Sequence, residues 1–176
     1  MTAPSLETDR LILREMTPDD HPALFEILGD SWTMRFYPRA FSKMEVEAWV
    51  ERWKQSFDRN RFGLWGLELK ESGRLAGDTG LSLQIVDGES LPEVGWHVHR
   101  DLQRRGYATE AARASLDYGF GHLGLERIIS LIRPENEPSW RVAEKLGMRL
   151  WKETDHAHLL HRVYLLERQD WPGGVI

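Results

Sequence analysis

The segment that most constrains how this chain can fold is residues 98–111, which read VHRDLQRRGYATEA. The order of residue types is that of a strand end, a short basic loop with one glycine, and the first turn of a helix. A first helical turn leaves backbone N–H groups free and carries a partial positive charge, so it attracts phosphate groups. Arg104 and Arg105 add charge, and Gly106 has no Cβ where a ligand would come close. The segment therefore predicts a phosphate-binding loop between a strand and a helix.

Hydrophobic periodicity and capping residues divide the rest of the chain into strands and helices. Strands are expected at residues 10–14, 64–69, 75–83, 93–98, 127–133, 149–154 and 159–166, with turns at 71–74 and 87–92. Helices are expected to begin at residues 17 and 42, and to cover residues 108–119 and 134–146. Strand runs joined by hairpins, with helices between them, predict a single α+β domain over residues 1–176.

The composition excludes several classes of protein. The 176 residues include no cysteine, which excludes a disulfide framework, a thiolate metal site and a cysteine nucleophile. No apolar run approaches 18 residues, and the first residues lack the pattern of a signal peptide, so we expect a cytoplasmic protein with no membrane span. The net charge of −5 argues against general nucleic-acid binding.

Two further patterns suggest ligands that we do not expect. Residues 119–124 match G-x-G-x-x-G, but they end a helix and precede a strand, whereas a dinucleotide-binding loop follows a strand and opens a helix. His156, His158 and His161 invite a metal interpretation, but no carboxylate pattern completes a recognised site. The sequence therefore predicts neither a dinucleotide nor a metal.

Three segments resemble the GCN5-related N-acetyltransferase (GNAT) family. Residues 103–108, QRRGYA, follow the family's pyrophosphate-loop pattern Gln/Arg-x-x-Gly-x-Gly/Ala, and residues 136–148 resemble its second coenzyme A segment. Residues 6–14, LETDRLILR, are similar to the opening of the Rim-type subgroup, which acetylates the N-termini of ribosomal proteins. The resemblance implies a twisted, mixed, mostly antiparallel sheet of about seven strands flanked by helices. In the family, strands 4 and 5 splay, and the pantetheine arm pairs with strand 4, here residues 93–98.

The same resemblance implies acetyl-CoA as the cosubstrate. Backbone N–H groups of the loop would bind its pyrophosphate, Val98 would contact the pantetheine and thioester through its backbone, and Asn136 would hold the pantetheine arm. An alternative role for Asn136 is helix capping, which an asparagine close to Pro138 also favours. The implied coenzyme residues are Val98, Arg104, Arg105, Gly106, Tyr107, Ala108, Thr109, Asn136 and Ser139.

Acetylation of a primary amine requires a base, because an alkyl amine is protonated near neutral pH. Glu93 is the first candidate, since family members often carry a catalytic or water-ordering glutamate at the start of strand 4. His97 is the alternative, because imidazole titrates near neutral pH. A bulge near Gly95 would turn either side chain toward the cleft. Ser139 matches a Rim-type serine near the sulfur.

The acid that protonates the departing thiolate is less well defined. Many relatives have a tyrosine where this chain has Ala143. The missing tyrosine leaves a non-catalytic acyl-CoA-binding sensor as an alternative to an enzyme.

Aromatic residues between the first two expected helices predict an acceptor site. The acceptor residues expected are Trp32, Arg35, Phe36 and Tyr37, with Trp65 and Trp96 as further walls. The activity implied is direct transfer of an acetyl group to a protein or peptide N-terminus. A small amine, such as a polyamine, an amino acid or an aminoglycoside-like antibiotic, is the alternative acceptor. A homodimer is expected by analogy alone.

Overall fold

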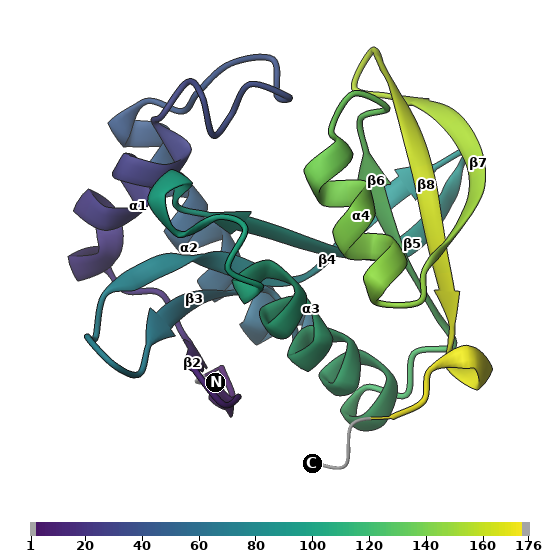
Figure 1. Cartoon of the computed structure of the whole chain (residues 1–176), viewed down its shortest axis with the longest axis horizontal. Helices are drawn as coiled ribbons and strands as arrows, with labels where there is room; N and C mark the ends of the chain where they lie inside the picture. Colours follow the sequence, from purple (N-terminus) through teal and green to yellow (C-terminus); the bar gives the residue numbers. More distant parts are fainter. Residues whose placement is uncertain (1–2, 174–176) are drawn as a thin grey trace.

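The computed structural model describes residues 3–173, in which one mixed sheet has the strand order β1-β2-β3-β4-β5-β6-β8-β7 (Figure 1). The strands are β1 (Leu6–Glu7), β2 (Leu11–Arg14), β3 (Leu64–Leu69), β4 (Leu75–Val86), β5 (Glu89–Val98), β6 (Arg127–Ile132), β7 (Arg149–His156) and β8 (Leu159–Glu167). The α-helices are α1 (His21–Leu28), α2 (Lys43–Asn60), α3 (Tyr107–Asp117) and α4 (Glu137–Lys145). The α+β class and the helices flanking a mostly antiparallel sheet are as expected.

Helix α2 shows how local sequence sets an element. Ser42 accepts a hydrogen bond from the backbone N–H of Glu45, and the Glu45 side chain accepts one from the backbone N–H of Ser42, which completes a capping box. Val46, Val50, Trp53 and Phe57 follow at helical spacing, and all four are buried. The helix therefore begins at the residue that the capping pattern predicts.

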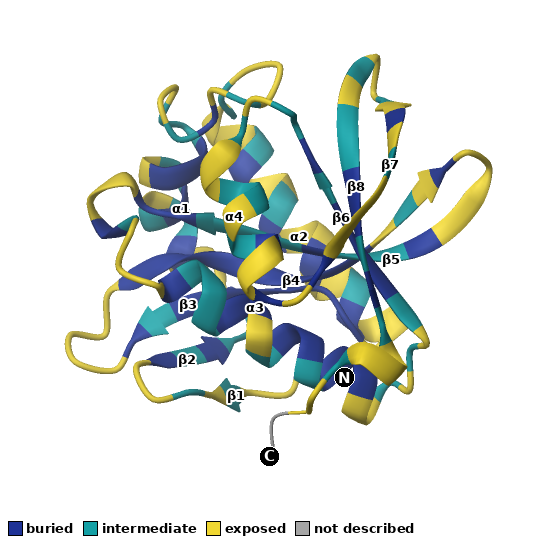
Figure 2. Cartoon of the chain, turned by 45° about the vertical axis from the view of Figure 1, so that its right-hand side comes forward, coloured by how far each residue is buried: buried dark blue, intermediate teal, exposed yellow. Residues whose placement is uncertain are grey.

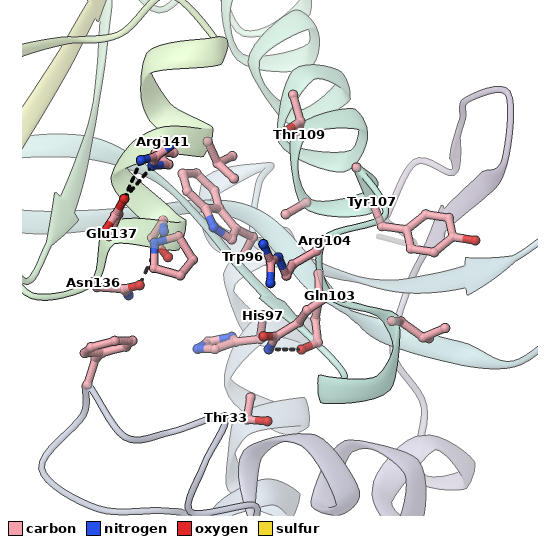
Figure 3. A pocket seen from close by; sticks show the side chains of 18 of the residues that line it. Thr33, Trp96, His97, Gln103, Arg104, Tyr107, Thr109, Asn136, Glu137 and Arg141 are labelled. Atoms are coloured by element: carbon pink, nitrogen blue, oxygen red, sulfur yellow. Dashed lines mark hydrogen bonds and ion pairs between the residues drawn. The ribbon is translucent and has the colours of Figure 1, made fainter.

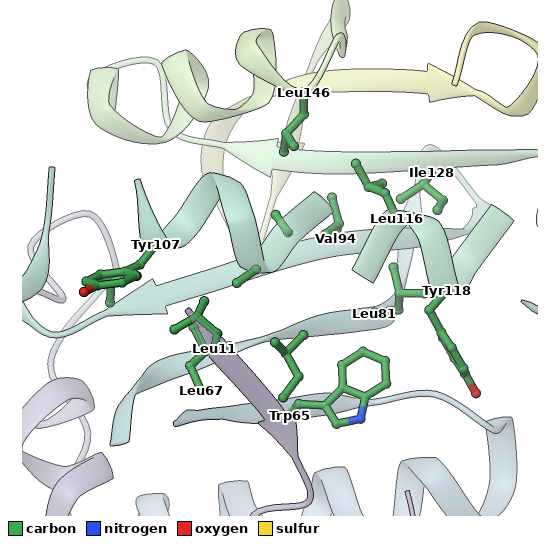
Figure 4. Close-up of a cluster of buried hydrophobic side chains, with 14 of the residues drawn as sticks. Leu11, Trp65, Leu67, Leu81, Val94, Tyr107, Leu116, Tyr118, Ile128 and Leu146 are labelled. Carbon is green, nitrogen blue, oxygen red and sulfur yellow. The ribbon is translucent and has the colours of Figure 1, made fainter. Parts of the chain in front are cut away.

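The sheet separates two hydrophobic layers. Helices α1 and α2 pack on one face through a cluster that includes Leu24 and Val50. Helix α3 and its neighbour α4 pack on the other face, over a larger cluster in which Val94 and Leu116 are fully buried (Figure 4). The central strands β3 and β4 are buried over most of their length because helices cover both faces of the sheet, whereas α2 is buried on one side and exposed on the other (Figure 2).

Strands β5 and β6 run parallel but share a single register pair, Glu93 with Ile129, in the described part of the chain. Beyond that pair the two strands separate, so the backbone of β5 toward Val98 has no strand partner on this side. β5 and β6 are the fourth and fifth of the strands expected from the sequence, because β1 was not among them, and their separation is the expected splay. The gap opens toward the segment of residues 98–109.

Three expectations about the sheet need correction. The sheet has eight strands in residues 3–173 rather than about seven, because the two residues of β1 add a short edge through the pair Leu6–Leu13. Strand β5 begins at Glu89 instead of residue 93, because pairing with β4 continues to Val86 and leaves only Asp87 and Gly88 as the turn. The β4–β5 register is unbroken, so the bulge expected near Gly95 is not formed between these two described strands.

The structure also shows where the glycine-rich motif lies and describes the membrane-span and metal-site features considered from the sequence. Residues 118–122 form a single π-helical turn that ends α3 before β6, so the G-x-G-x-x-G match opens no helix. In the described part of the chain, no helix is long and apolar enough to cross a membrane. Within the same residues, no group of three or more histidine, aspartate or glutamate side chains is arranged to hold a metal ion.

Candidate active site

A cavity of about 790 Å³ lies where β5 leaves β6 (Figure 3). Its walls come from the end of β5, the N-terminal turns of α3 and α4, and the loop between α1 and α2 (residues 29–42, the α1–α2 loop). The lining residues that the sequence predicted are Trp32, Arg35, Phe36, Tyr37, Trp96, His97, Val98, Arg104, Gly106, Tyr107, Ala108, Thr109, Asn136 and Ser139. Segments far apart in the sequence therefore meet around one space.

The loop before α3 forms the basic wall of this cavity. Arg104 and Gly106 both adopt left-handed backbone angles, with φ of 63° and 85°, which turn the chain sharply into the helix. Gln103 donates a hydrogen bond of 3.0 Å from Nε2 to the carbonyl oxygen of Val98 and so ties the loop to the strand end. No side chain in the described residues caps α3, so its first backbone N–H groups face the cavity without a side-chain acceptor.

Arg105 is the exception in this loop, because its side chain does not line the cavity. Its carbonyl oxygen accepts a hydrogen bond of 2.9 Å from Nη1 of Arg10. Arg10 in turn donates from Nε to Glu110 at 2.6 Å, and Thr8 donates to the same carboxylate. These contacts of Arg10 with Glu110 and with the Arg105 carbonyl oxygen form a clamp on the loop. The clamp was not predicted from the sequence, although an acidic residue in a first helical turn is a recognisable signal.

The geometry of the loop fits a pyrophosphate. Phosphate binding requires an uncapped helix N-terminus, a guanidinium beside it, here that of Arg104, and a residue without a Cβ where the phosphate comes close to the backbone. A Cβ built on Gly106 would lie 3.3 Å from Nη2 of Arg10 and would need a strained φ, so a side chain there would disturb the clamp. The described residues therefore suit the pyrophosphate of a coenzyme.

Helix α4 supplies the opposite wall. Asn136 is its N-cap residue, and its Oδ1 accepts a hydrogen bond of 3.3 Å from the backbone N–H of Ser139. The capping role considered for Asn136 is therefore present, while the amide nitrogen has no hydrogen bond in the described residues. Ser139 also lines the cavity. Ala143 is fully buried, so no hydroxyl reaches the cavity from that position.

His97 is the titratable side chain of β5 on the cavity wall. Its Nδ1 lies 2.6 Å from Oδ1 of Asp78 on β4, and its Nε2 lies 2.8 Å from the hydroxyl of Tyr37. Trp49 of α2 donates from Nε1 to the other oxygen of Asp78 at 2.7 Å. Asp78 and Trp49 were not predicted from the sequence. The sequence signal for these contacts was an aspartate within an apolar strand, because a buried charge requires charged or hydrogen-bonding partners.

Glu93 lies outside the cavity lining, at the fork of β5 and β6. Its Oε1 accepts from the backbone N–H of Leu131 at 3.1 Å, and its Oε2 accepts from Gln84 at 2.7 Å and Ser82 at 3.3 Å. Burial raises the pKa of Glu93 above its ordinary value and outweighs these hydrogen bonds. Four residues of strand, about 13 Å, separate it from His97, so the two side chains do not meet.

Five of the six predicted acceptor residues line the cavity, and Trp65 does not. Its side chain is fully buried in the core, where Nε1 donates to the carbonyl oxygen of Pro4 and the ring packs against Phe57 and Tyr118. The prediction for Trp65 is wrong because β3 lies between β2 and β4, is buried along almost its whole length, and contributes none of the residues that line the cavity.

The α1–α2 loop carries the other aromatic residues to the cavity. Arg35 stacks over Trp32 at 3.8 Å and over Phe36 at 4.4 Å, and Arg100 lies 5.3 Å from the same Trp32 ring. Although 45% of Tyr37 is exposed, desolvation of its hydroxyl beside His97, with smaller contributions from the charges of Glu93 and Asp78, raises its pKa above the ordinary value. Tyr37 therefore keeps its proton at neutral pH and can donate to His97.

Comparison with known proteins identifies the family of this chain. The family model described as acetyltransferase (GNAT) domain matches residues 10–149. The chain is 39% identical to YkkB of Bacillus subtilis, covering 84% of this chain and 86% of that protein. It is 36% identical to YnaD of the same organism, which is named an N-acetyltransferase, with 82% of each chain covered.

Solved structures share the fold over nearly the whole chain. The GNAT-family acetyltransferase from Bacillus anthracis superposes with a TM-score of 0.80 at 28% identity, covering 94% of this chain and 99% of that chain. RimJ of Mycobacterium smegmatis, solved with CoA-disulfide, has a TM-score of 0.74 at 23% identity, covering 93% of this chain and 85% of that chain. Family model, relatives and fold agree, and the chain belongs to the GNAT family of N-acetyltransferases.

Proposed function

We propose that this chain transfers the acetyl group of acetyl-CoA to a primary amine, and that its acceptor is the N-terminal amine of a protein or peptide. The observation that carries this proposal is the continuous cavity that joins the uncapped N-terminus of α3 to the wall formed by His97 and Tyr37. A coenzyme at one end and an amine at the other would meet beside the open edge of β5. The Rim-type resemblance of residues 6–14 favours a protein N-terminus.

Each part of the coenzyme has residues suited to it. Backbone N–H groups at residues 107–109 and the guanidinium of Arg104 would hold the pyrophosphate. The amide nitrogen of Asn136 and the backbone of Val98 would hold the pantetheine arm on the two sides of the gap. Bound acetyl-CoA supplies a thioester carbon that a neutral amine attacks directly. The hydroxyl of Ser139 lies at the cavity wall and would donate to the sulfur as it gains charge.

We assign the base to His97 in preference to Glu93. His97 lines the cavity and carries a lone pair toward Tyr37, whereas the Glu93 carboxylate lies outside the lining and accepts from three donors. Glu93 instead joins the two strands at the fork and so sets the width of the gap. On this assignment, the His97→Gln variant loses about 100-fold in kcat, the lower range for loss of a general base.

The charge of the cavity favours an acceptor with one amine. Glu137 is the one carboxylate among the described lining residues, and Arg141 pairs with it at 2.7 Å. A polyamine would therefore find no unpaired carboxylate for its second ammonium group in this part of the chain. A peptide N-terminus presents one ammonium group followed by backbone and apolar atoms, which suits the aromatic wall of Trp32, Phe36 and Trp96.

The test is thiol release from acetyl-CoA over a panel of amines, with mass spectrometry to locate the acetyl group. The panel contains peptides of varied N-terminus, the same peptides with a blocked N-terminus and a free lysine, spermidine, amino acids and aminoglycosides. Fastest turnover with free N-termini, and loss of turnover on blocking, is the expected result. Faster turnover with any small amine overturns the peptide acceptor. Acetyl-CoA binding without turnover on any amine overturns acetyl transfer and favours an acyl-CoA sensor.

A further inference from the structure

The side chain of Asp78 is fully buried in the middle of β4. A buried carboxylate costs several kcal/mol unless charged or hydrogen-bonding partners compensate for the lost water. Its two oxygens have one strong partner each, the His97 imidazole at 2.6 Å and the Trp49 indole at 2.7 Å. The two partners come from other elements, His97 from β5 and Trp49 from α2, so the carboxylate holds the imidazole where three elements meet.

The hydrogen bonds determine which imidazole nitrogen carries the proton. An ionised carboxylate can only accept, so Nδ1 of His97 donates to Asp78 and the neutral ring has its lone pair on Nε2. Nε2 lies 2.8 Å from the hydroxyl of Tyr37, which therefore donates to it. The three groups form one directed chain, with the Tyr37 oxygen as the end that is open to the cavity.

Aromatic rings and a close strand pairing surround His97 in this chain. The His97 ring lies 5.3 Å from the Tyr37 ring and 6.1 Å from the Trp49 ring, measured between centroids. Next to Asp78, a Cβ on Gly77 would lie 1.9 Å from the carbonyl oxygen of His97, so glycine at this position lets β4 and β5 approach. Only 9% of the His97 side chain is exposed.

We propose that Tyr37, His97 and Asp78 form a proton relay that deprotonates the acceptor ammonium group, with Asp78 and Trp49 as positioning residues; this inference rests on the proposed function. In the step, the ammonium N–H bond breaks and its proton passes to the Tyr37 oxygen. The Tyr37 proton passes to Nε2 of His97. The positive charge moves from the ammonium group to the imidazolium beside Asp78, and the amine nitrogen recovers its lone pair.

Asp78 is the charged group in direct contact with His97, and the other charged groups lie further away. Strand β4 contributes Asp78, helix α2 contributes the uncharged indole of Trp49, and the α1–α2 loop contributes Tyr37 and, further along the wall, Arg35. On β5 itself, Glu93 lies four residues away. Arg104, Lys145 and the Glu137–Arg141 pair complete the charged groups of the described cavity wall.

The Asp78→Asn variant tests the relay because the Trp49 indole fixes the orientation of the introduced amide. The Trp49 indole only donates, so the amide oxygen must face it, and the amide NH₂ then donates to Nδ1 of His97. That hydrogen bond moves the imidazole proton to Nε2 and removes the lone pair that Tyr37 needs. In the double variant Asp78→Asn, Trp49→Phe, the amide can turn back and restore the original tautomer.

The experiment has two readouts on each folded variant. Nitrogen-15 NMR of labelled histidine, with His97→Gln to assign the signal, reports the His97 tautomer without any acceptor. Peptide acetylation measured from pH 5 to 9 reports kcat and its acid limb. For Asp78→Asn we expect the Nε2–H tautomer, a kcat lower by about 100-fold, an acid limb moved to lower pH and an unchanged Kd for acetyl-CoA.

The double variant and a second aspartate provide the controls. Replacing Trp49 as well should recover at least tenfold of the kcat lost in Asp78→Asn, which a general loss of stability would not do. Asp101→Asn removes the carboxylate near His99, 3.9 Å from its Nδ1, and should leave kcat within twofold of the wild type.

Two results overturn the relay while acetyl transfer stands. One is a wild-type His97 protonated at Nε2, and the other is an active Asp78→Asn enzyme with kcat within twofold of the wild type. A wild type that binds acetyl-CoA but acetylates no amine overturns the proposed function instead, and the relay's role with it.

Discussion

Arg10 and Glu110 lie one hundred residues apart in sequence and form an ion pair at 2.6 Å beside the first turn of α3. Arg10 also holds the carbonyl oxygen of Arg105, so the pair connects the start of β2 to the loop before α3. Thr8 donates a further hydrogen bond to the Glu110 carboxylate. The loop before α3, where we propose that the coenzyme binds, is therefore clamped from the N-terminal edge of the sheet, outside the cavity itself.

The clamp predicts a coenzyme-binding defect without a catalytic one. Glu110→Gln removes the charge that orients Arg10, and we expect the Kd for acetyl-CoA to rise about tenfold, or about 1.4 kcal/mol, with kcat little changed. Isothermal titration calorimetry measures the affinity. Arg105→Ala is the matched control, because it keeps the carbonyl that Arg10 binds, and a larger loss in this variant would contradict the clamp.

The clamp also predicts a dependence of stability on pH. Burial disfavours the Glu110 charge, but hydrogen bonds from Thr8 and Arg10 outweigh it and lower the pKa of Glu110 below its ordinary value. A lowered carboxyl pKa stabilises the fold above the unfolded-state pKa, and this contribution disappears as pH falls through the folded-state pKa. Urea unfolding should therefore show the wild type more stable than Glu110→Gln at pH 7, with the difference vanishing in acid.

Ser139 is predicted to act on the chemical step. Its backbone N–H is engaged with Asn136, while its hydroxyl is at the cavity wall. Ser139→Ala keeps the helix cap and should lower kcat about tenfold with less than about a twofold change in the Kd for acetyl-CoA, because only stabilisation of the departing sulfur is lost. Steady-state kinetics and calorimetry separate the two, and an unchanged kcat removes Ser139 from the mechanism.

Glu93 is predicted to affect stability with the opposite pH dependence to Glu110. Because burial raises its pKa, the folded state binds the proton more tightly than the unfolded state. Its contribution to stability is therefore largest in acid and falls as pH rises from the ordinary glutamate pKa through the raised value. Thermal unfolding from pH 4 to 8 should show Glu93→Gln gaining stability relative to the wild type as pH rises. A constant difference across this range would contradict a buried, titrating Glu93.

Substitutions of Trp65 and Trp96 are predicted to differ in their effects on stability and on the KM for the acceptor. Trp65→Phe loses the hydrogen bond to Pro4 and leaves unfilled volume, so it should lower the free energy of unfolding by about 2 kcal/mol while the KM for the acceptor stays constant. Trp96→Phe should raise the KM for the acceptor with a smaller loss of stability, because Trp96 lines the cavity. If Trp65→Phe alone altered the KM for the acceptor, Trp65 would belong to the acceptor site.

Local sequence was enough for most of the elements and for the position of the basic loop before α3. The capping box at Ser42 began α2 where expected, and the order of strand, basic loop and Gly106 placed the N-terminus of α3. These features depend on hydrogen bonds and backbone angles within a few residues, which a single sequence displays. The limits of β5 were missed because a strand ends where its partner does, and β4 continues to Val86.

The arrangement of the site depends on contacts between distant segments. His97 and Tyr37 were both candidates from sequence, but only the β4–β5 register brings Asp78 opposite His97, and only the packing of α2 brings Trp49 to the same carboxylate. Trp65 and Trp96 read alike as aromatic residues of strands, and the sheet sends one to the core and the other to the cavity. The sequence by itself determined the family, the α+β elements and the basic loop before α3, because their signals are local. The tertiary structure decided the contacts of the proposed relay, the Arg10–Glu110 clamp and the aromatic cavity wall, because each needs side chains that only strand pairing and helix packing bring close together.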